Sequence, residues 1–318
     1  MVLLRATTPT ATQQSVYSGS HYASSAVPSM RRRIYLDVPT PLGFTTVHYA
    51  EAGDNSKPTL LLLMGFPSSS NHYRDFISLL SDSFHVLAPD FPGFGLTKVP
   101  KNFKYTFDNL AAVISAWLKE LKVETYALYM FDYGAPIGFR LALENPCSVK
   151  AIVTQNGNAY NEGFGADFWK PIWKIWETDN SPSAREIVRN SMLTQEATIY
   201  QYYTSDKALV DPEQPIRDYF QNVAGKENQE HQLDLFYDYR TNKAMYPQWQ
   251  KYLRKSQVPL LAAWGKGDPA FIAAGAEAYK QDLPHAEVHL LDAGHFALET
   301  ARWEIAELCK RFLAKVDF

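Results

Sequence analysis

The sequence predicts an α/β fold in which a mainly parallel sheet is covered by helices on both faces. Short apolar runs of strand length alternate with helical patterns from about residue 34 to the C-terminus. Several of these runs end directly in turns that contain glycine and a polar residue. In sheets of this class the ligand site lies at the carboxyl ends of the strands.

The bulk composition is that of a globular enzyme with a single large core. A chain of 318 residues is long enough for one large domain with an insertion. The net charge of -3 gives no basic surface for a nucleic acid, so no such partner is expected. Two cysteines, Cys147 and Cys309, are too few for a disulfide framework and favour a reducing, cytoplasmic setting. No apolar run approaches the roughly 18 residues that span a bilayer, so no membrane contact is expected.

Residues 1–30 are predicted to form a disordered tail. They are rich in Ser, Thr and Ala and contain no acidic residue, and such a segment buries too little surface to fold. An organellar transit peptide has the same composition and remains the alternative. The segment has no apolar core of the kind that a secretory signal needs.

The core is predicted from residues 31–156 and 251–318. Residues 34–38 and 45–49 are expected to form an opening hairpin. Further strands are expected at residues 59–63, 85–88, 125–130, 150–154, 258–263 and 287–291. Residues 107–121 carry Leu110, Ile114 and Trp117 on one helical stripe. Residues 301–316 repeat this pattern and predict a C-terminal helix.

Residues 157–250 are predicted to form a helical cap. About ninety residues pass here without a strand pattern, which is far longer than an ordinary connection. Tyrosine, tryptophan and phenylalanine are dense in this segment. Most of these rings are expected to pack the core of the cap, and a minority facing the cleft would form an apolar pocket.

Asp132 is the first candidate for the chemistry. It lies between a predicted strand and a predicted helix at residues 137–143, in the strand-turn-helix setting of the G-x-S-x-G nucleophile elbow. Gly134 permits the close backbone approach that such an elbow requires. The alternative interpretation is that Asp132 caps the helix that follows.

Asp268 and His295 complete the candidate set. Each follows its own predicted strand and lies next to a glycine. The order along the chain is nucleophile, acid and base, and three such coincidences favour a catalytic triad over isolated turn residues.

The residue types predict the reaction. A carboxylate can displace a leaving group from carbon and form an ester on Asp132. His295 would then deprotonate the water that hydrolyses this ester, while Asp268 orients the imidazole. Backbone N–H groups of Phe66 and Tyr133 are the expected donors to an oxyanion or leaving group.

These segments resemble the α/β-hydrolase superfamily in its branch of epoxide hydrolases and haloalkane dehalogenases. The resemblance runs from about Tyr35 to the C-terminus. It includes the stretch at residues 89–95 and the sequence Gly294-His295-Phe296. It implies an α/β-hydrolase fold, the triad of Asp132, Asp268 and His295, and a helical cap inserted after the sixth strand.

Departures from this pattern bear on the substrate. Met64 stands where family members usually have His. Dehalogenases usually have Trp after the nucleophile and a second Trp or Asn, whereas this chain has Tyr133 and Phe66 at those positions. Epoxide hydrolases use two cap tyrosines to protonate the leaving oxygen. Tyr239 resembles the second of these, the first has no match, and ordinary core packing is the alternative for Tyr239.

The sequence therefore predicts a hydrolase that opens an epoxide to a diol. Haloalkane dehalogenation by the same chemistry is the alternative, as is a cyclase or ligand-binding protein on this fold. The expected partner is a small apolar substrate, contacted by Trp169, Trp173 and Phe296. No cofactor or metal is expected, because the sequence has no glycine-rich phosphate loop and no metal-ligand cluster. A homo-oligomer is left open.

Overall fold

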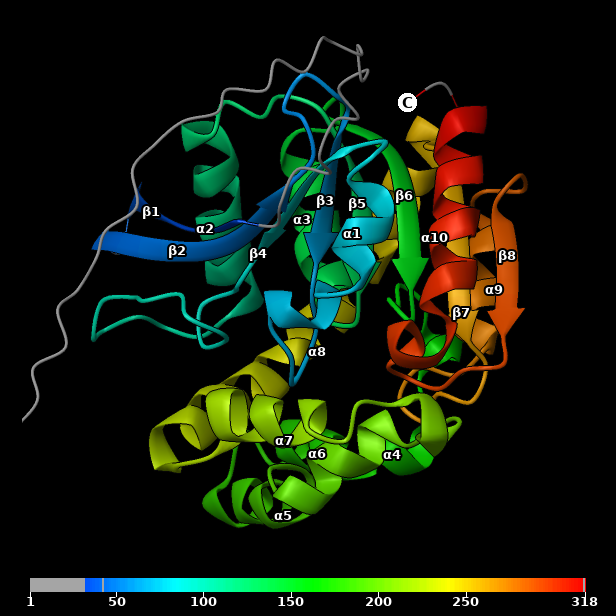
Figure 1. Cartoon of the computed structure of the whole chain (residues 1–318). Coiled ribbons are helices and arrows are strands. Elements are labelled where there is room, and N and C mark those ends of the chain that lie inside the picture. The colour runs from blue at the N-terminus through cyan, green and yellow to red at the C-terminus, as the bar shows by residue number, and fades with distance from the viewer. Residues whose placement is uncertain (1–31, 42, 317) are drawn as a thin grey trace, which may run out of the picture.

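The structure, a computed structural model, describes residues 32–41, 43–316 and 318. The predicted tail at residues 1–30 lies outside these residues. Within them, eight strands form one sheet in the order β1-β2-β4-β3-β5-β6-β7-β8. The sheet is the centre of the molecule, with helices on its faces and at one end (Figure 1).

The first two strands form the antiparallel edge of the sheet. β1 (Arg32–Thr40) and β2 (Gly43–Ala52) make the predicted hairpin, and β2 pairs antiparallel with β4 (His85–Pro89). The remaining neighbours pair in parallel. These strands are β3 (Thr59–Leu63), β5 (Tyr126–Phe131), β6 (Val149–Gln155), β7 (Leu260–Gly265) and β8 (Glu287–Leu291).

Helices cover both faces of the sheet, as the sequence predicts. α2 (Phe107–Glu120) packs against α3 (Gly134–Glu144) on one face, and α1 (Phe76–Leu80) packs against α10 (Ala297–Lys315) on the other (Figure 1). The short α9 (Ala274–Ala278) lies beside β8. β3, β5 and β7 are buried along almost their whole length, which explains why they read as continuous apolar runs rather than alternating ones.

A helical insertion, residues 166–256, separates β6 from β7. It comprises α4 (Ala166–Glu177), α5 (Pro182–Met192), α6 (Gln195–Tyr202), α7 (Gln214–Asp218), a π-helical turn (Tyr219–Val223) and α8 (Lys226–Ser256). Ser181 and Thr194 cap the N-termini of α5 and α6 with their side-chain oxygens. Figure 1 shows α4 to α7 at the ends of the sheet toward which the parallel strands point.

Element boundaries differ from the sequence prediction where tertiary packing decides them. α8 continues six residues past the predicted end at 250 because Tyr252 and Leu253 are buried. α10 begins at Ala297, four residues early, and Ala301 has non-helical angles within it. That kink separates the first turn from the amphipathic part that the pattern predicts.

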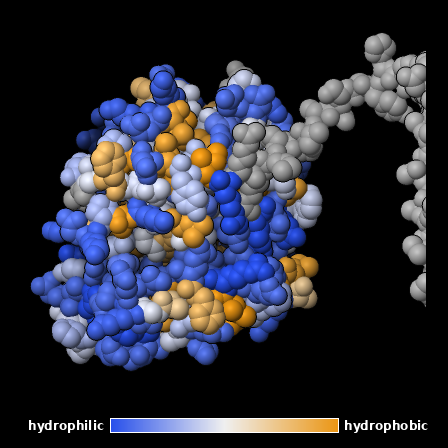
Figure 2. Space-filling model, turned by 60° about the vertical axis from the view of Figure 1, so that its left-hand side comes forward, coloured by the Kyte–Doolittle hydropathy of each residue, from blue (hydrophilic) through white to orange (hydrophobic). Residues whose placement is uncertain are grey.

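The surface is mostly hydrophilic with small apolar groups on the face in Figure 2. The most exposed large apolar side chains are scattered over several elements, and they include Phe44, Trp303, Phe220 and Tyr200. No helix of the described residues has the length and apolar character to cross a membrane.

Candidate active site

The backbone around Asp132 is built for close approach. Asp132 follows β5 with φ at 49°, a left-handed angle that non-glycine residues adopt at a cost and that is frequent at functional turns. A Cβ on Gly134 would lie 2.2 Å from the Leu63 carbonyl oxygen, and one on Gly65 would lie 2.5 Å from Asp132 Oδ1. Glycine is therefore required on both sides of the carboxylate.

The two oxygens of Asp132 have different surroundings. Oδ1 accepts a hydrogen bond of 2.7 Å from the backbone N–H of Phe66, and the backbone N–H of Tyr133 also donates to the carboxylate. Oδ2 faces His295, with 3.9 Å between this oxygen and Nε2. One oxygen is thus held by the backbone, while the other points toward the space in front of the imidazole.

Asp268 orients the imidazole of His295. Its Oδ2 lies 2.7 Å from His295 Nδ1, and its Oδ1 accepts from the backbone N–H of Ala270 at 2.7 Å. Asn156 also donates to Oδ2, at 2.8 Å. Because this oxygen already accepts from Asn156, His295 Nδ1 donates to it, which leaves Nε2 as the ring nitrogen that faces Asp132.

The helical insertion contributes to the position of His295. The backbone N–H of His295 donates to Thr204 Oγ1 at 3.0 Å, and its carbonyl accepts from Gln155 Nε2 at 3.1 Å. Asp292, the other acid near His295 in sequence, is 92 % exposed and pairs with Lys266. The structure therefore joins His295 to Asp268 and leaves Asp292 on the surface.

Burial and charge act in opposite directions on the pKa values of Asp132 and His295. Burial raises the pKa of Asp132 to about 6, against the opposing effects of His295 and the Phe66 and Tyr133 N–H groups. Burial alone would lower the pKa of His295, but the charge and hydrogen bond of Asp268, with the charge of Asp132, raise it above its ordinary value. Each group thus favours the charged form of the other.

A small cavity adjoins Asp132 and His295. Its volume is about 10 Å³, which is room for about one water molecule. Its wall is otherwise largely aromatic. The lining residues are Phe66, Asp132, Tyr133, Phe168, Trp169, Gln201, Phe236, Ala270, Phe271 and His295.

A groove of about 420 Å³ lies outside this cavity, between α4 and the segment from α5 to α6. Phe168 and Gln201 line both the groove and the cavity. A substrate larger than water therefore needs these side chains to move. The substrate atoms that do not fit the cavity can then lie in the adjoining groove.

The other residues predicted from the sequence lie at different depths. Trp169 is on the cavity wall, and its Nε1 donates to the Ala270 carbonyl at 2.8 Å. Trp173 contacts Phe164 away from that wall, and Phe296 stacks on Tyr202 at 3.7 Å between ring centroids. Their contact with substrate stays a prediction.

Tyr239 is fully buried behind the wall rather than on it. Its ring lies 4.7 Å from that of Trp169 and 5.9 Å from that of Tyr133, measured between centroids. Burial raises its pKa well above the ordinary value, with further contributions from Tyr246 and Asp132. The hydroxyl is thus protonated near neutral pH, and its role as a proton donor stays a prediction.

Sequence reasoning missed several residues of this site. Phe168, Phe236 and Phe271 were not distinguished from other apolar residues, and Gln201 carried no signal at all. Asn156 follows β6 with φ at 49°, and its place directly after a predicted strand was the available signal. Asn158 and Asn161 follow the same strand, so residue type and position alone do not distinguish Asn156 from them.

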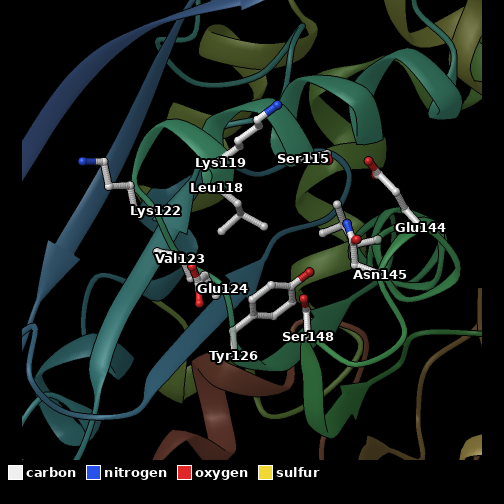
Figure 3. A pocket seen from close by; sticks show the side chains of 11 residues that line it. Ser115, Leu118, Lys119, Lys122, Val123, Glu124, Tyr126, Glu144, Asn145 and Ser148 are labelled. Atoms are coloured by element: carbon white, nitrogen blue, oxygen red, sulfur yellow. The ribbon is translucent and has the colours of Figure 1, made fainter.

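A larger pocket of about 530 Å³ lies elsewhere (Figure 3). Its wall includes Tyr126, which begins β5, whereas Asp132 follows the carboxyl end of that strand. Figure 3 shows Lys119 and Glu144 at its rim, so its charges are mixed. It therefore lies at the end of the sheet opposite the triad. No group of metal-ligating side chains occurs among the described residues.

A family model of the alpha/beta hydrolase fold matches residues 58–301. The chain belongs to this family. The fold predicted from the sequence is thereby confirmed, and the chain is a hydrolase of this fold.

Curated relatives match along most of the chain. A Saccharomyces cerevisiae protein described as an uncharacterized hydrolase is 45% identical over 82% of this chain and 91% of its own length. A haloalkane dehalogenase of Mycobacterium marinum is 27% identical over 86% of this chain and 91% of its own. A cis-3-alkyl-4-alkyloxetan-2-one decarboxylase of Shewanella oneidensis is 26% identical over 85% and 86%.

The solved structure of a haloalkane dehalogenase from Bradyrhizobium elkani is similar in fold. Its TM-score is 0.73 at 21% sequence identity, and the match covers 91% of this chain and 99% of that one. At this identity the likeness speaks for the fold alone.

Proposed function

We propose that this hydrolase opens a neutral carbon electrophile, in the first place an epoxide, through a covalent ester on Asp132. The observation that carries the proposal is the buried Asp132 carboxylate, with one oxygen on the Phe66 N–H and the other 3.9 Å from His295 Nε2. A carboxylate that attacked an ester or amide would give an anhydride that reverts. Attack on a saturated carbon gives an alkyl ester that His295 can remove.

The proposed reaction has two steps. Asp132 Oδ2 forms a bond to the epoxide carbon, the ring C–O bond breaks, and the ring oxygen takes up one proton. His295 Nε2 then takes one proton from water, whose oxygen attacks the ester carbonyl and releases the diol and Asp132. The proton taken up in the first step and the proton released in the second cancel, so that one epoxide and one water give one diol.

The cavity wall favours a leaving oxygen over a leaving halide. The indole N–H of Trp169 is already bonded to a backbone carbonyl, and aromatic rings stand at positions 66 and 133. Tyr133 is on the wall and Tyr239 lies behind it. The Tyr133 hydroxyl is buried without a hydrogen-bond partner among the described residues, whereas the Tyr239 hydroxyl interacts with that of Tyr246. A buried hydroxyl without a partner costs about 1–3 kcal/mol, and a substrate oxygen would supply that partner.

The names of two relatives point to substrates that are chemically related to epoxides. The Mycobacterium marinum relative is named a haloalkane dehalogenase, so hydrolytic dehalogenation by the same ester on Asp132 is the second candidate. The Shewanella oneidensis relative is named for an alkylated oxetan-2-one, which is also a strained oxygen ring with alkyl chains. The groove between α4 and α6 is largely apolar and suits such a chain. The proposed partner is therefore a small, largely apolar molecule.

Proton release separates these candidates. Unbuffered enzyme would be offered terminal epoxides and 1-haloalkanes of matched chain length while the pH is held constant by titration. Epoxide opening consumes substrate without net acid, whereas dehalogenation releases one proton and one halide for each substrate consumed. An Asp132→Asn variant is the matched control. Full turnover by this control would contradict the ester mechanism and favour a cyclase, whereas no turnover by either protein would favour a ligand-binding protein.

A further inference from the structure

The loop that follows β3 supplies the Phe66 N–H and is held from outside the core. A local turn forms within it, because the backbone N–H and the side chain of Ser68 both donate to the Gly65 carbonyl at 2.8 Å. Met64 at its start is buried and apolar, so it provides no hydrogen bond at the position where the family usually has His. Another group must fix the loop.

Asn222 in the π-helical turn makes that contact. It is fully buried, its Nδ2 donates to the Pro67 carbonyl at 2.8 Å, and its Oδ1 accepts from the Gly95 N–H at 2.7 Å. The Pro67 carbonyl has no other polar partner among the described residues. The Asn222 carbonyl in turn accepts from Gln232 Nε2 at 3.2 Å, which ties the turn to α8.

Asn222 completes a chain of contacts that ends on the nucleophile. The Pro67 carbonyl is one residue along from Phe66, whose N–H bonds Asp132 Oδ1 at 2.7 Å. Asp90 also ties the loops after β3 and β4 together, through the N–H groups of Ser70 and Leu96. Ser70, where Asp90 holds the loop, lies four residues after Phe66, whereas Asn222 bonds the residue directly after Phe66. A π-helical turn is a rare feature that occurs often at functional sites.

We infer that Asn222 is a positioning residue through which the helical insertion holds the Phe66 N–H against the Asp132 carboxylate. It touches neither the carboxylate nor the cavity, and it acts only through the loop after β3. Its effect on Asp132 does not depend on which electrophile the enzyme opens. The inference therefore stands or falls separately from the proposed function.

The titration of Asp132 reports this contact without any substrate. The N–H bond from Phe66 favours the ionised carboxylate, so a loosened loop raises the pKa of Asp132. Other titratable groups act on the same carboxylate and stay unchanged in the experiment. They are His295, Asp268, Tyr73, Tyr133 and Tyr239.

The test is carbon NMR of the full chain with labelled aspartate carboxyl carbons. The Asp132 signal is the one missing from an Asp132→Asn variant, and its midpoint in the unaltered protein is expected at about 6. Asn222→Ala removes both side-chain bonds. Asn222→Asp keeps the volume and the acceptor for the Gly95 N–H but loses the donor to the Pro67 carbonyl. Both are expected to raise the midpoint by about half a unit or more.

Asn228→Asp is the matched control. Asn228 lies six residues away, and its Nδ2 donates to the Ala224 carbonyl at 3.0 Å within the insertion. The same chemical change there is expected to leave the Asp132 midpoint where it was. If folded Asn222→Asp titrates like the unaltered protein, the inference is wrong. If Asn222→Ala does not fold, Asn222→Asp decides the outcome alone.

Discussion

Among the described residues, two buried Asp–His pairs share a hydrogen bond, and only one of them faces a further carboxylate, that of Asp132. His295 Nδ1 lies 2.7 Å from Asp268, and His48 Nδ1 lies 2.6 Å from Asp90. Both pairs are buried. His295 Nε2 faces Asp132 across a cavity, whereas His48 Nε2 is covered and has no hydrogen-bond partner among the described residues.

The second pair is part of the framework. Besides His48, Asp90 accepts from the N–H groups of Ser70 at 2.7 Å and Leu96 at 2.9 Å. It thereby ties together the loops that follow β3 and β4. The comparison teaches that an oriented imidazole becomes a base only where a nucleophile and a space for water face its free nitrogen.

The largest expected difference is between the two histidines. His295→Gln removes the proposed base and should lower turnover by about 10²–10⁴-fold. His48→Gln should leave turnover within about threefold and act on stability alone. Steady-state rates of both variants on one accepted substrate measure the contrast. Equal losses would show that the two pairs do not differ in role.

The aspartates of the two pairs, Asp268 and Asp90, are expected to differ in the same way: one affects turnover and the other stability. Asp268→Asn can donate to His295 Nδ1 and would stabilise the wrong tautomer, so turnover should fall by about 10²-fold or more. Asp90→Asn weakens the bonds from the Ser70 and Leu96 N–H groups and should cost about 1–3 kcal/mol of stability. Urea unfolding beside turnover assays checks both. A stability loss confined to Asp268→Asn would reverse the assignment.

Asp132→Asn should stabilise the fold above pH 6. Burial raises the pKa of Asp132 to about 6, so between pH 4 and 6 the folded state binds more protons than the unfolded chain. Stability from this group therefore falls as pH rises through that window. Replacing the charged side chain should raise the free energy of unfolding by about 1–3 kcal/mol at pH 7.5. Thermal unfolding of variant and parent at pH 4 and pH 7.5 tests this, and an equal difference at both would contradict the burial cost.

The smallest effect is expected from Trp169→Phe. The indole N–H is bonded to the Ala270 carbonyl, so its loss should change turnover of an epoxide by no more than about threefold. A dehalogenase that held its halide with this indole would lose far more. The same variant assayed on a 1-haloalkane therefore distinguishes the two leaving groups.

The core and the placement of Asp132, Asp268 and His295 at one edge of the sheet could be predicted because their signals are local in the sequence. Buried parallel strands read as short apolar runs, and Asp132, Asp268 and His295 each follow such a run beside glycine. The carboxyl ends of parallel strands meet at one edge of the sheet. The structure joins His295 to the predicted Asp268, whereas Asp292 is exposed and pairs with Lys266.

The wall of the site could not be predicted in the same way. Phe168, Gln201 and Asn222 come from the helical insertion, and their neighbours depend on how its helices pack over the sheet. Helical periodicity separates buried from exposed faces but does not say which buried ring faces a cavity. Tyr239 illustrates this limit, since its sequence neighbourhood suggests the cavity and the fold places it one layer behind.

The ester on Asp132 is the central claim, and the mass of the intact protein tests it most directly. His295→Phe would be incubated with a panel of epoxides and primary alkyl halides, because loss of the base should trap the ester. We predict an added mass equal to one whole epoxide, carried by the peptide that contains Asp132. The double variant with His295→Phe and Asp132→Asn should show no such addition. An adduct on another residue, or none from a substrate that the parent enzyme turns over, would contradict the account.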